Sequence, residues 1–554
     1  AKSSGNLASD SAMPDSPENN FATWNVLSKG AGTSTAEGNL KAIYSSNNQA
    51  GISSTFSVDT GKYYFEVGCQ TASVFIGVAP STYKNPDNIN STTGSIHYAV
   101  NGNKSLAGTQ TSYGASYGDG DVIGVALNLD DGEVTFYKNN SSQGALSLTS
   151  GLSYGISSAS GSSTSTFTVI LNSGQDSSFA GTETAQGNTD GNGIGDFYYA
   201  PPSGFLALCT ANLPEPTIGA NSDTQADDHF NTVLYTGNGG TQDVTGFGFQ
   251  PDWIWDKSRN QSGSHMSVDS SRGVGKYLRT NLTSAEVDDA SILTHFISDG
   301  VTVGDINGNA SSSSAVMRGW KANGGTTSSN SDGSITSTVQ ANTDAGFSIV
   351  TYTGTGSNAT VGHGLSSVPQ MYIVKRRSNT GNWYTYHESI GNTKRLRLDE
   401  TSSATTESTA WNNTSPTSSV FSIGTSVDVN AGSNTYVSYV FSEIEGYSKF
   451  DSYTGNVALD GTFVYTGFEP AFILFTNTVN AGYNWPVWDG VINPFNVATK
   501  HVFSDLSQAE GAFPALDLLS NGFKLRHPDL YYNAGVKFIY MAFAKSSFKY
   551  ANAR

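Results

Sequence analysis

Acidic side chains are the residues of this sequence best suited to catalysis, because two carboxylates roughly 5 to 10 Å apart can hydrolyse a glycosidic bond. The candidate acids are Glu388, Glu443, Glu445, Asp489 and Asp517. Glu443 and Glu445 share one face of a strand, but a strand that leaves the core with its acids in solvent is the better explanation. No His-Glu-x-x-His motif occurs. We therefore expect no catalytic residues and no enzyme activity.

A glycine-rich loop is the best candidate for a metal site. In the segment DGNGIGD, Asp190, Asn192 and Asp196 offer oxygen ligands, as in a shortened calcium loop. The loop lacks the bidentate glutamate of such loops, and the eight histidines include no pair at metal-ligand spacing. We expect a turn in solvent, no metal and no cofactor, with calcium binding at Asp190–Asp196 as the alternative.

Aromatic residues on three similar strands are candidates for binding. The aligned pairs are His265 with Asp269, Trp383 with His387, and Trp485 with Asp489, and the residues before the second member are Val268, Tyr386 and Trp488. Positions three apart in a strand lie on opposite faces. We therefore predict that Val268, Tyr386 and Trp488 face a core, while His265, Trp383 and Trp485 face outward. Outward rings would pack on a neighbouring subunit or, less favoured, stack on sugar.

Three tyrosines near the N-terminal end are candidates for a receptor contact. Tyr83, Tyr113 and Tyr117 lie in Gly/Ser-rich sequence that is typical of loops. Tyrosine in such loops offers a large, adaptable contact surface. We predict that these residues contribute to recognition.

The elements that must position these residues are β-strands. The chain has 554 residues, of which 37% are hydrophobic and 13% charged, and it contains 61 glycines. Helices need charged residues on their solvent faces, whereas strands accept threonine and turns accept asparagine and glycine. No long segment has apolar residues at helical spacing. The composition predicts an all-β protein with several domains.

Charge and targeting signals exclude some classes of protein. The net charge of −18 argues against nucleic-acid binding, which needs clustered lysine and arginine. Cys69 and Cys209 lie in apolar strand-like runs and are expected to be small buried residues. The N-terminal segment has no basic-then-apolar leader, and no apolar run approaches about 18 residues. We expect synthesis in a cytoplasm, release by lysis and no membrane insertion.

One hairpin and one repeat organise the chain. Residues 120–139 alternate apolar and polar positions around Asp130-Asp131-Gly132, which predicts two antiparallel strands. Further on, Tyr-Thr-Gly recurs at Tyr235, Tyr352 and Tyr465, each time followed by a proline, an apolar strand and a final aromatic strand. The third copy goes almost directly from Tyr-Thr-Gly to its proline, which predicts a shortened hairpin there. The segment from one Tyr-Thr-Gly motif to the next is long enough for about seven or eight strands, which suffice for a β-sandwich.

The first part of the chain resembles the SPRY family. The segments GKYYFEV (61–67), FIGVA (75–79) and GDVIGVALNLDDGEVTFYKNN (120–140) occur in the order typical of that family. The resemblance implies a lectin-like sandwich that binds protein or glycan through loops at one end. The rest of the chain, including EIEGYSKFDSYTGN (443–456), resembles repeat modules in structural proteins of marine tailed phages.

The predicted fold class is a SPRY-like β-sandwich followed by three related β-sandwich repeats. The predicted parts are an N-terminal arm (1–19), the SPRY-like sandwich (20–180), a Gly-rich loop and packed connector (181–229), repeat 1 (230–325), a connector (326–345), repeat 2 (346–454) and repeat 3 (455–554).

The resemblances imply a bacteriophage virion protein. The preferred interpretation is a tail-fibre or appendage adhesin that binds a host surface glycan or protein. The alternatives are a capsid decoration or capsid-fibre protein and a glycan-degrading tail enzyme. Expected partners are other virion proteins, the host receptor and further copies of the chain, with a trimer as one option. Weak contacts gain from such multivalency.

Overall fold

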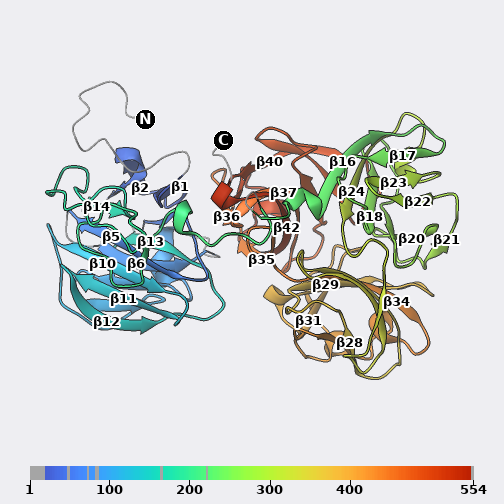
Figure 1. Ribbon diagram of the computed structural model, residues 1–554, viewed down its shortest axis with the longest axis horizontal. Helices are drawn as coiled ribbons and strands as arrows, with labels where there is room; N and C mark the ends of the chain where they lie inside the picture. The colour runs from blue at the N-terminus through green and yellow to red at the C-terminus, as the bar shows by residue number, and fades with distance from the viewer. Residues whose placement is uncertain are drawn as a thin grey trace. The chain divides into compact units, whose positions relative to one another are not determined.

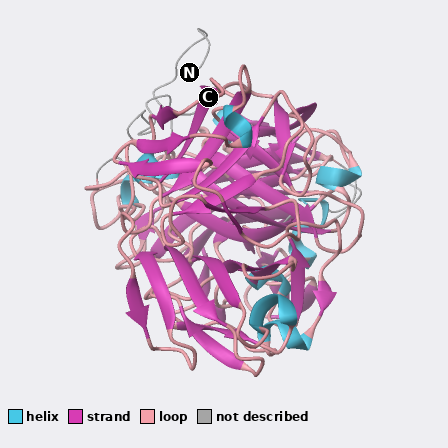
Figure 2. Cartoon of the chain, turned by 90° about the vertical axis from the view of Figure 1, so that its right-hand side faces the viewer, coloured by secondary structure: helices cyan, strands magenta, loops and turns pink. Residues whose placement is uncertain are grey.

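In the computed structural model the regular secondary structure is almost entirely β-strand, as the composition predicts (Figures 1 and 2). It describes residues 19–45, 50–70, 74–81, 86–161, 166–219 and 222–550. The chain forms two compact units, one made of Ala1–Pro214 with Phe463–Tyr465 and the other of Glu215–Thr462 with Thr466–Arg554. Within the described residues, no helix is long and apolar enough to cross a membrane.

The first unit is a sandwich of two antiparallel sheets (Figure 1). One sheet contains, in spatial order, β1 (Trp24–Lys29), β4 (Gly51–Ser54), β13 (Tyr154–Ser160), β6 (Val74–Pro80), β7 (Ile96–Ala99), β8 (Asn103–Leu106) and β9 (Thr109–Ser112). The other contains β12 (Ser141–Ser147), β11 (Glu133–Lys138), β10 (Val122–Asn128), β5 (Lys62–Cys69), β14 (Phe167–Asn172), β3 (Lys41–Tyr44) and β2 (Thr33–Ala36), with β15 (Leu206–Ala207) beside β5. Its short 3-10 helices are η2 (Glu37–Asn39), η3 (Pro86–Ser91) and η4 (Thr210–Asn212), and a further one, η5 (Ala226–Asp228), lies at the start of the second unit.

The predicted hairpin of residues 120–139 is confirmed. β10 and β11 pair antiparallel, with Val125 opposite Phe136 and Asn128 opposite Glu133. Asn128 Oδ1 accepts the Asp131 N–H at 3.1 Å, which closes the turn. The hairpin continues the sheet from β5, so it carries one wall of the sandwich core.

The second unit contains three repeats with the same strand order. Repeat 1 contains β16 (Phe230–Thr236), β17 (Gln242–Thr245), β18 (Trp253–Ser258), β19 (Met266–Asp269), β20 (Lys276–Arg279), β21 (Val287–Asp288), β22 (Leu293–Ile297), β23 (Gly300–Val303), η6 (Asn307–Asn309) and β24 (Ser314–Trp320). Repeat 2 contains β27 (Phe347–Thr353), β28 (Ala359–Gly362), β29 (Met371–Arg376), β30 (Trp383–His387), η7 (Glu388–Ile390), β31 (Lys394–Arg397), β32 (Thr405–Thr406), α1 (Ser408–Trp411), β33 (Val420–Ile423), α2 (Val427–Asn430) and β34 (Thr435–Phe441). Repeat 3 contains β35 (Ser448–Thr454), β36 (Phe463–Tyr465, grouped with the first unit), β37 (Phe468–Asn477), β38 (Pro486–Asp489), β39 (Ala498–Phe503), β40 (Gly511–Leu519), β41 (Gly522–Leu525), α3 (Leu530–Asn533), β42 (Lys537–Ser547) and η8 (Phe548–Tyr550).

In each repeat the last strand lies between the first strand and the third, the third pairs with the fourth, and the fourth pairs with the fifth. The orders are β16-β24-β18-β19-β20, β27-β34-β29-β30-β31 and β35-β42-β37-β38-β39. Between repeats 1 and 2, β25 (Ser328–Asn330) and β26 (Ser337–Asn342) extend the sheet of repeat 2 at the side of β27. Smaller sheets, β17-β23-β22 in repeat 1 and β28-β33 in repeat 2, cover one face of the large sheet and enclose the sandwich core, whereas in repeat 3 strands β40 and β41 continue the large sheet beyond β39.

The third repeat begins at β35, earlier than the predicted boundary at residue 455. β35 pairs with β42 as β16 pairs with β24 and β27 with β34, and each of these first strands ends in Tyr-Thr before a glycine. The equivalent of Tyr235 and Tyr352 is therefore Tyr453, and the predicted match to Tyr465 is wrong. The predicted shortened hairpin is wrong for the same reason. This copy contains two Tyr-Thr-Gly motifs, and only the second one, at Tyr465, lies almost directly before the proline.

The glycine of the Tyr-Thr-Gly motif is required by a close backbone contact. A Cβ at Gly237, Gly354 or Gly455 would lie 2.2, 2.5 or 2.2 Å from the carbonyl oxygen of Ala310, Ala431 or Ala534. Any side chain here would force the first strand away from the segment before the last strand. The motif therefore marks a packing contact of the repeat and not a ligand site.

The large sheets turn their second faces toward one another, and aromatic side chains of all three repeats meet there. The ring centroids of Trp253 and Tyr439 lie 4.1 Å apart, which joins repeats 1 and 2. Those of Phe230 and Phe543 lie 5.1 Å apart and join repeats 1 and 3. Phe441 and Phe543, at 6.0 Å, join repeats 2 and 3. The second unit is thus one ring of three sandwiches around a shared core.

Candidate functional site

His265, Trp383 and Trp485 lie buried between repeats, so the prediction that they face outward is wrong. Their exposed fractions are 0, 1 and 1%. The Trp383 indole donates to the carbonyl of Arg279 at 3.0 Å, and the Trp485 indole donates to that of Arg397 at 3.1 Å. Each tryptophan side chain therefore packs against the preceding repeat, which is a structural role.

The strand alternation behind that prediction is nevertheless correct. Val268 and Tyr386 belong to the sandwich cores of repeats 1 and 2, on the face opposite His265 and Trp383. Trp488 is also fully buried. Alternation assigns a residue to a face, but it does not say whether solvent or another repeat covers that face.

The contacts between repeats follow one cyclic pattern and form three joints. At the 2–1 joint the Gly381 N–H donates to Thr283 O at 2.8 Å, at the 3–2 joint Gly482 donates to Thr401 O at 2.7 Å, and at the 1–3 joint Gly263 donates to Ser507 O at 2.8 Å. A second set of backbone hydrogen bonds runs in the other direction. The backbone N–H groups of Glu286, Ala404 and Glu510 donate to the carbonyl oxygens of Arg377, Thr478 and Arg259, at 2.8, 3.0 and 2.7 Å respectively. The three joints close the ring within one chain.

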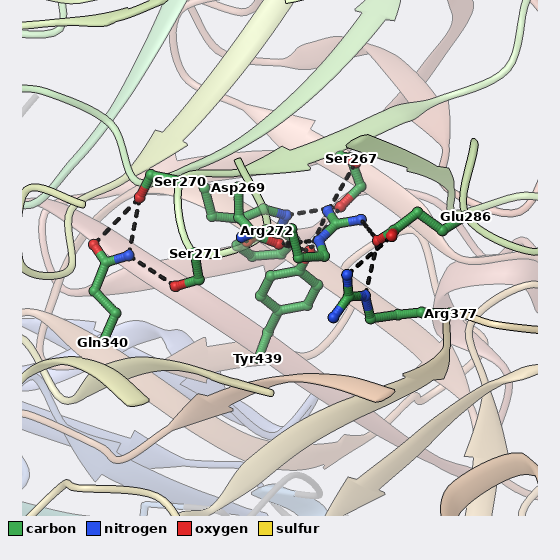
Figure 3. A network of polar contacts seen from close by, with 10 residues as sticks. Ser267, Asp269, Ser270, Ser271, Arg272, Glu286, Gln340, Arg377 and Tyr439 are labelled. Atoms are coloured by element: carbon green, nitrogen blue, oxygen red, sulfur yellow. Dashed lines mark hydrogen bonds and ion pairs between the residues drawn. The ribbon is translucent and has the colours of Figure 1, made fainter. Parts of the chain in front are cut away.

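A buried ion network strengthens the 2–1 joint (Figure 3). Arg272 bonds Asp269 at 2.5 Å and Glu286 at 3.1 Å, and Tyr439 of repeat 2 donates to Asp269 at 2.8 Å. Arg377 of repeat 2 binds both carboxylate oxygens of Glu286 at 2.9 Å. Burial opposes the charge on Arg272, but Asp269, Tyr439 and Glu286 outweigh it and raise the pKa of its guanidinium. Asp269 thus has a structural role.

Three of the five candidate catalytic acids are engaged by basic side chains. Asp489 pairs with the fully buried Arg318 at 3.1 Å across the 1–3 joint. Glu443 pairs with Lys449 at 2.5 Å. Asp517 pairs with Arg526 at 2.5 Å. At the 3–2 joint, the residue aligned with Asp269 and Asp489 is His387. Its Nε2 lies 3.2 Å from the carbonyl oxygen of Tyr540.

The loop with calcium-like spacing is closed by the protein's own donors. Asp190 Oδ1 accepts the N–H groups of Asn192 and Ile194 at 2.9 Å each. Its Oδ2 accepts Ala207 N–H and Asn212 Nδ2 at 2.8 Å each. Asp190 is buried and ties the loop to the connector instead of lying in a solvated turn. Within the described ranges, no group of three or more His, Cys, Asp or Glu residues is placed to hold a metal ion.

Tyr117 is a structural residue, so its predicted role in receptor contact is wrong. It is 5% exposed, and its hydroxyl points to the carbonyl oxygens of Val74 at 2.9 Å and Tyr98 at 2.8 Å. Tyr113 is half-buried and packs edge-on against Tyr98 with ring centroids 5.5 Å apart. Tyr83 lies outside the described residues.

The first unit contains a cavity that the sequence analysis did not identify. It has a volume of about 310 Å³, and Cys69 and Phe179 form part of its wall. Asp119, Asp121 and Glu183 also line it. Asp121 is held by Lys138 at 3.3 Å, whereas Asp119 is exposed and Glu183 half-buried. The available signal was the pair of acids in the Gly-Asp-Gly-Asp segment directly before the hairpin.

Both cysteines are buried, as expected, and neither forms a disulfide. Glu66, which lies on β5, fixes the connector that follows the sandwich. Its carboxylate accepts the N–H groups of Tyr198 at 2.8 Å and Tyr199 at 2.7 Å. Burial raises the pKa of Glu66 to about 7.

Comparisons with known proteins match two separate parts of the chain, one largely within each unit. Residues 225–547 match the family model described as "Domain of unknown function (DUF7483)", and residues 62–150 match the model of the SPRY domain. The SPRY resemblance is thereby confirmed. The solved SPRY domain of human HERC1 is 16% identical over 27% of this chain and 96% of that chain, with a TM-score of 0.24. The TRIM65 PSpry domain is 17% identical over 27% of this chain and 91% of that chain, also with a TM-score of 0.24. No curated protein matches.

Proposed function

This chain belongs to the DUF7483 family and carries a SPRY domain, a β-sandwich protein-binding module, and from this premise we propose that it is a bacteriophage virion protein whose SPRY domain binds the host surface. In this proposal it acts as a tail-fibre or appendage adhesin, made in the host cytoplasm and exposed on the virion. The ring of repeats is the scaffold that attaches to other virion proteins.

The cavity in the SPRY domain is the observation that carries the proposal. The ring uses its aromatic residues at the joints, as the burial of Trp383 and Trp485 illustrates, which leaves them unable to contact a receptor. The SPRY cavity, in contrast, presents Asp119 and Glu183 beside open space. Carboxylates at a cavity of this size favour a lysine or arginine side chain of a host surface protein. A glycan receptor is the alternative within the same proposal.

The proposal includes no catalytic step, cofactor or nucleic acid. Glu443, Asp489 and Asp517 are each held in an ion pair, which supports structural roles for these acids. A net charge of −18 disfavours contact with phosphate backbones. Several copies on one particle would add avidity to a weak receptor contact.

Localisation on purified particles and binding to host cells test the proposal together. Antibody labelling is expected at the tail or an appendage, whereas label spread over the shell would assign the capsid decoration alternative. The double variant Asp119→Asn with Glu183→Gln should weaken binding to host cells at least tenfold. Asp59→Asn, a change of an exposed acid in the same unit, is the matched control and should bind normally. Equal binding by all three proteins would refute the assignment of the cavity.

A further inference from the structure

Two of the three joints contain a buried lysine at the same position. Lys375 Nζ donates to Thr283 O at 2.9 Å at the 2–1 joint. Lys257 Nζ lies 3.4 Å from Ser507 O at the 1–3 joint and donates to its neighbour Ser258 O at 2.8 Å. Burial lowers the pKa of both ammonium groups to about 8. At both joints, therefore, an ammonium group meets the carbonyl that also accepts the glycine N–H described above.

The 3–2 joint has threonine at this position. Lys257, Lys375 and Thr476 each follow a proline by six residues and lie opposite Val316, Val437 and Ile539 of the last strands. The short side chain of Thr476 stays within its own repeat, with Oγ1 3.4 Å from Asn484 O. Thr401 O is the carbonyl equivalent to Thr283 O and Ser507 O, and it accepts only the Gly482 N–H among the described residues.

The same joint also has fewer ion pairs. At the other two joints, Arg377 pairs with Glu286 at 2.9 Å and Arg259 with Glu510 at 2.6 Å. The equivalent residues of the 3–2 joint are Thr478 and Ala404, which share only a backbone hydrogen bond. Both cationic positions of this joint are therefore neutral.

A cavity with acidic walls lies at the 3–2 joint. It has a volume of about 400 Å³ and is lined by Thr401, Asp399 and Glu400 of repeat 2 and by Asp505 of repeat 3, among others. Glu400 is neutralised by Arg397 at 2.9 Å. Asp399 and Asp505, which occupy equivalent positions in successive repeats, have no basic side chain within ion-pair distance among the described residues.

The hydrogen bonds of these two acids leave one oxygen without a donor. Asp505 accepts Trp485 N–H at 3.0 Å and Asn484 Nδ2 at 2.6 Å. Asp399 Oδ1 accepts Trp383 N–H at 2.9 Å, whereas its buried Oδ2 has no partner among the described residues. Burial raises the pKa of Asp399 to about 6 and also raises that of Asp505. A buried carboxylate oxygen without a donor is costly, so a cation here gains both a charge and a hydrogen bond.

We propose that the cavity at the 3–2 joint binds a primary ammonium group in the place that lysine takes at the other two joints. The ammonium donates to Thr401 O and lies against Asp399 and Asp505. Three donors on a compact head fit one carbonyl and two carboxylates. The ammonium comes from a lysine side chain of another protein or from a free polyamine, since both present the same chemistry.

The test measures thermal unfolding of the full chain with different cations at equal ionic strength. n-Butylammonium and spermidine should raise Tm by about 2 °C or more relative to tetramethylammonium, which has no N–H donor. Spermidine that binds at least tenfold more tightly than n-butylammonium assigns a free polyamine. Equal affinities assign a lysine side chain, because one ammonium then suffices.

Two variants locate the effect. Thr476→Lys supplies the lysine within the chain, so it should raise Tm and abolish the response to amines. Asp505→Asn should weaken amine binding at least tenfold and still fold, because Asn281 occupies the equivalent position and accepts the N–H of His265 at 3.1 Å. It decides the question if Thr476→Lys does not fold.

A third variant creates the site elsewhere. Lys375→Ala removes the ammonium from the 2–1 joint, so n-butylammonium should restore part of the lost Tm and tetramethylammonium should not. The proposal is overturned if wild-type Tm is the same in all three cations. It is also overturned if the amine response persists unchanged in Asp505→Asn or in a folded Thr476→Lys.

Discussion

Replacing Trp383 by alanine should destabilise the ring of repeats by about 4 to 8 kcal/mol. The side chain is 1% exposed, and truncating a buried tryptophan costs about 3 to 5 kcal/mol. Its indole also donates to Arg279 O at 3.0 Å, and a buried carbonyl left without that donor costs about 1 to 3 kcal/mol more. Because whole domains are stable by only about 5 to 15 kcal/mol, the loss should be visible without precise extrapolation.

Urea unfolding followed by tryptophan fluorescence measures this loss. Of the eight tryptophans, only Trp24 lies in the first unit, so the signal reports mainly on the ring. Trp485→Ala should give a similar loss, because the two rings are equivalent. Phe495→Ala is the matched control: its ring is 80% exposed, and its removal should change the free energy of unfolding by less than about 0.5 kcal/mol.

The opposite result would restore the outward-facing interpretation. If Trp383→Ala stays within about 1 kcal/mol of wild type and loses binding to host cells, the Trp383 side chain is a receptor contact and the reasoning from the joints fails. If it unfolds at lower urea and the folded fraction binds normally, its role is packing.

Three further predictions concern charge and accessibility. Because burial raises the pKa of Glu66 from 4.5 to about 7, the folded first unit binds this proton more tightly than the unfolded chain does. The free energy of unfolding should therefore fall by up to about 3 kcal/mol as pH rises from about 4.5 to 7. Calorimetry should show this slope in wild type and not in Glu66→Gln. Glu286→Ala leaves Arg377 without its carboxylate and removes one of the two carboxylates of Arg272, so it should cost about 3 to 5 kcal/mol in urea unfolding, whereas Asp288→Ala, at an exposed pair, should cost less than about 1 kcal/mol. Cys209, which is fully buried, should react with a thiol reagent only after unfolding, and fast labelling of both thiols in the native chain would contradict its burial.

Local sequence patterns were sufficient to predict the strands, but not which repeat covers each strand. The hairpin around Gly132 depends on neighbouring residues, so alternation and turn chemistry predicted it. The position of Trp383 depends on Arg279 in another repeat, and no local pattern encodes that contact. The boundary of repeat 3 was misplaced because Tyr453 and Tyr465 carry the same motif, and only strand pairing distinguishes them.

A signal for the buried second face was nevertheless present. The third strands read WIWDK (253–257), MYIVK (371–375) and FILFT (472–476), with apolar residues at successive positions and not in alternation. Such runs are typical of strands covered on both faces. They argue that the large sheets have no solvent face at their centre, and hence that Trp383 at the start of β30 and Trp485 directly before β38 are covered by protein. The acidic cavity at Asp399 and Asp505 had no comparable signal, because its walls come from two repeats.

Closure of the ring within one chain explains how one joint could lose its cations. In an open assembly each joint holds two parts together by itself, so losing a lysine and an ion pair would separate them. In the ring, the 2–1 and 1–3 joints already hold repeats 2 and 3 on either side of repeat 1, so the 3–2 joint forms at high effective concentration. Thr476 is tolerated there for that reason, whereas the same change at Lys375 weakens a joint with a lysine and a buried ion network. The joint under the least structural demand is thus the one whose surface is free to recognise something other than the chain itself.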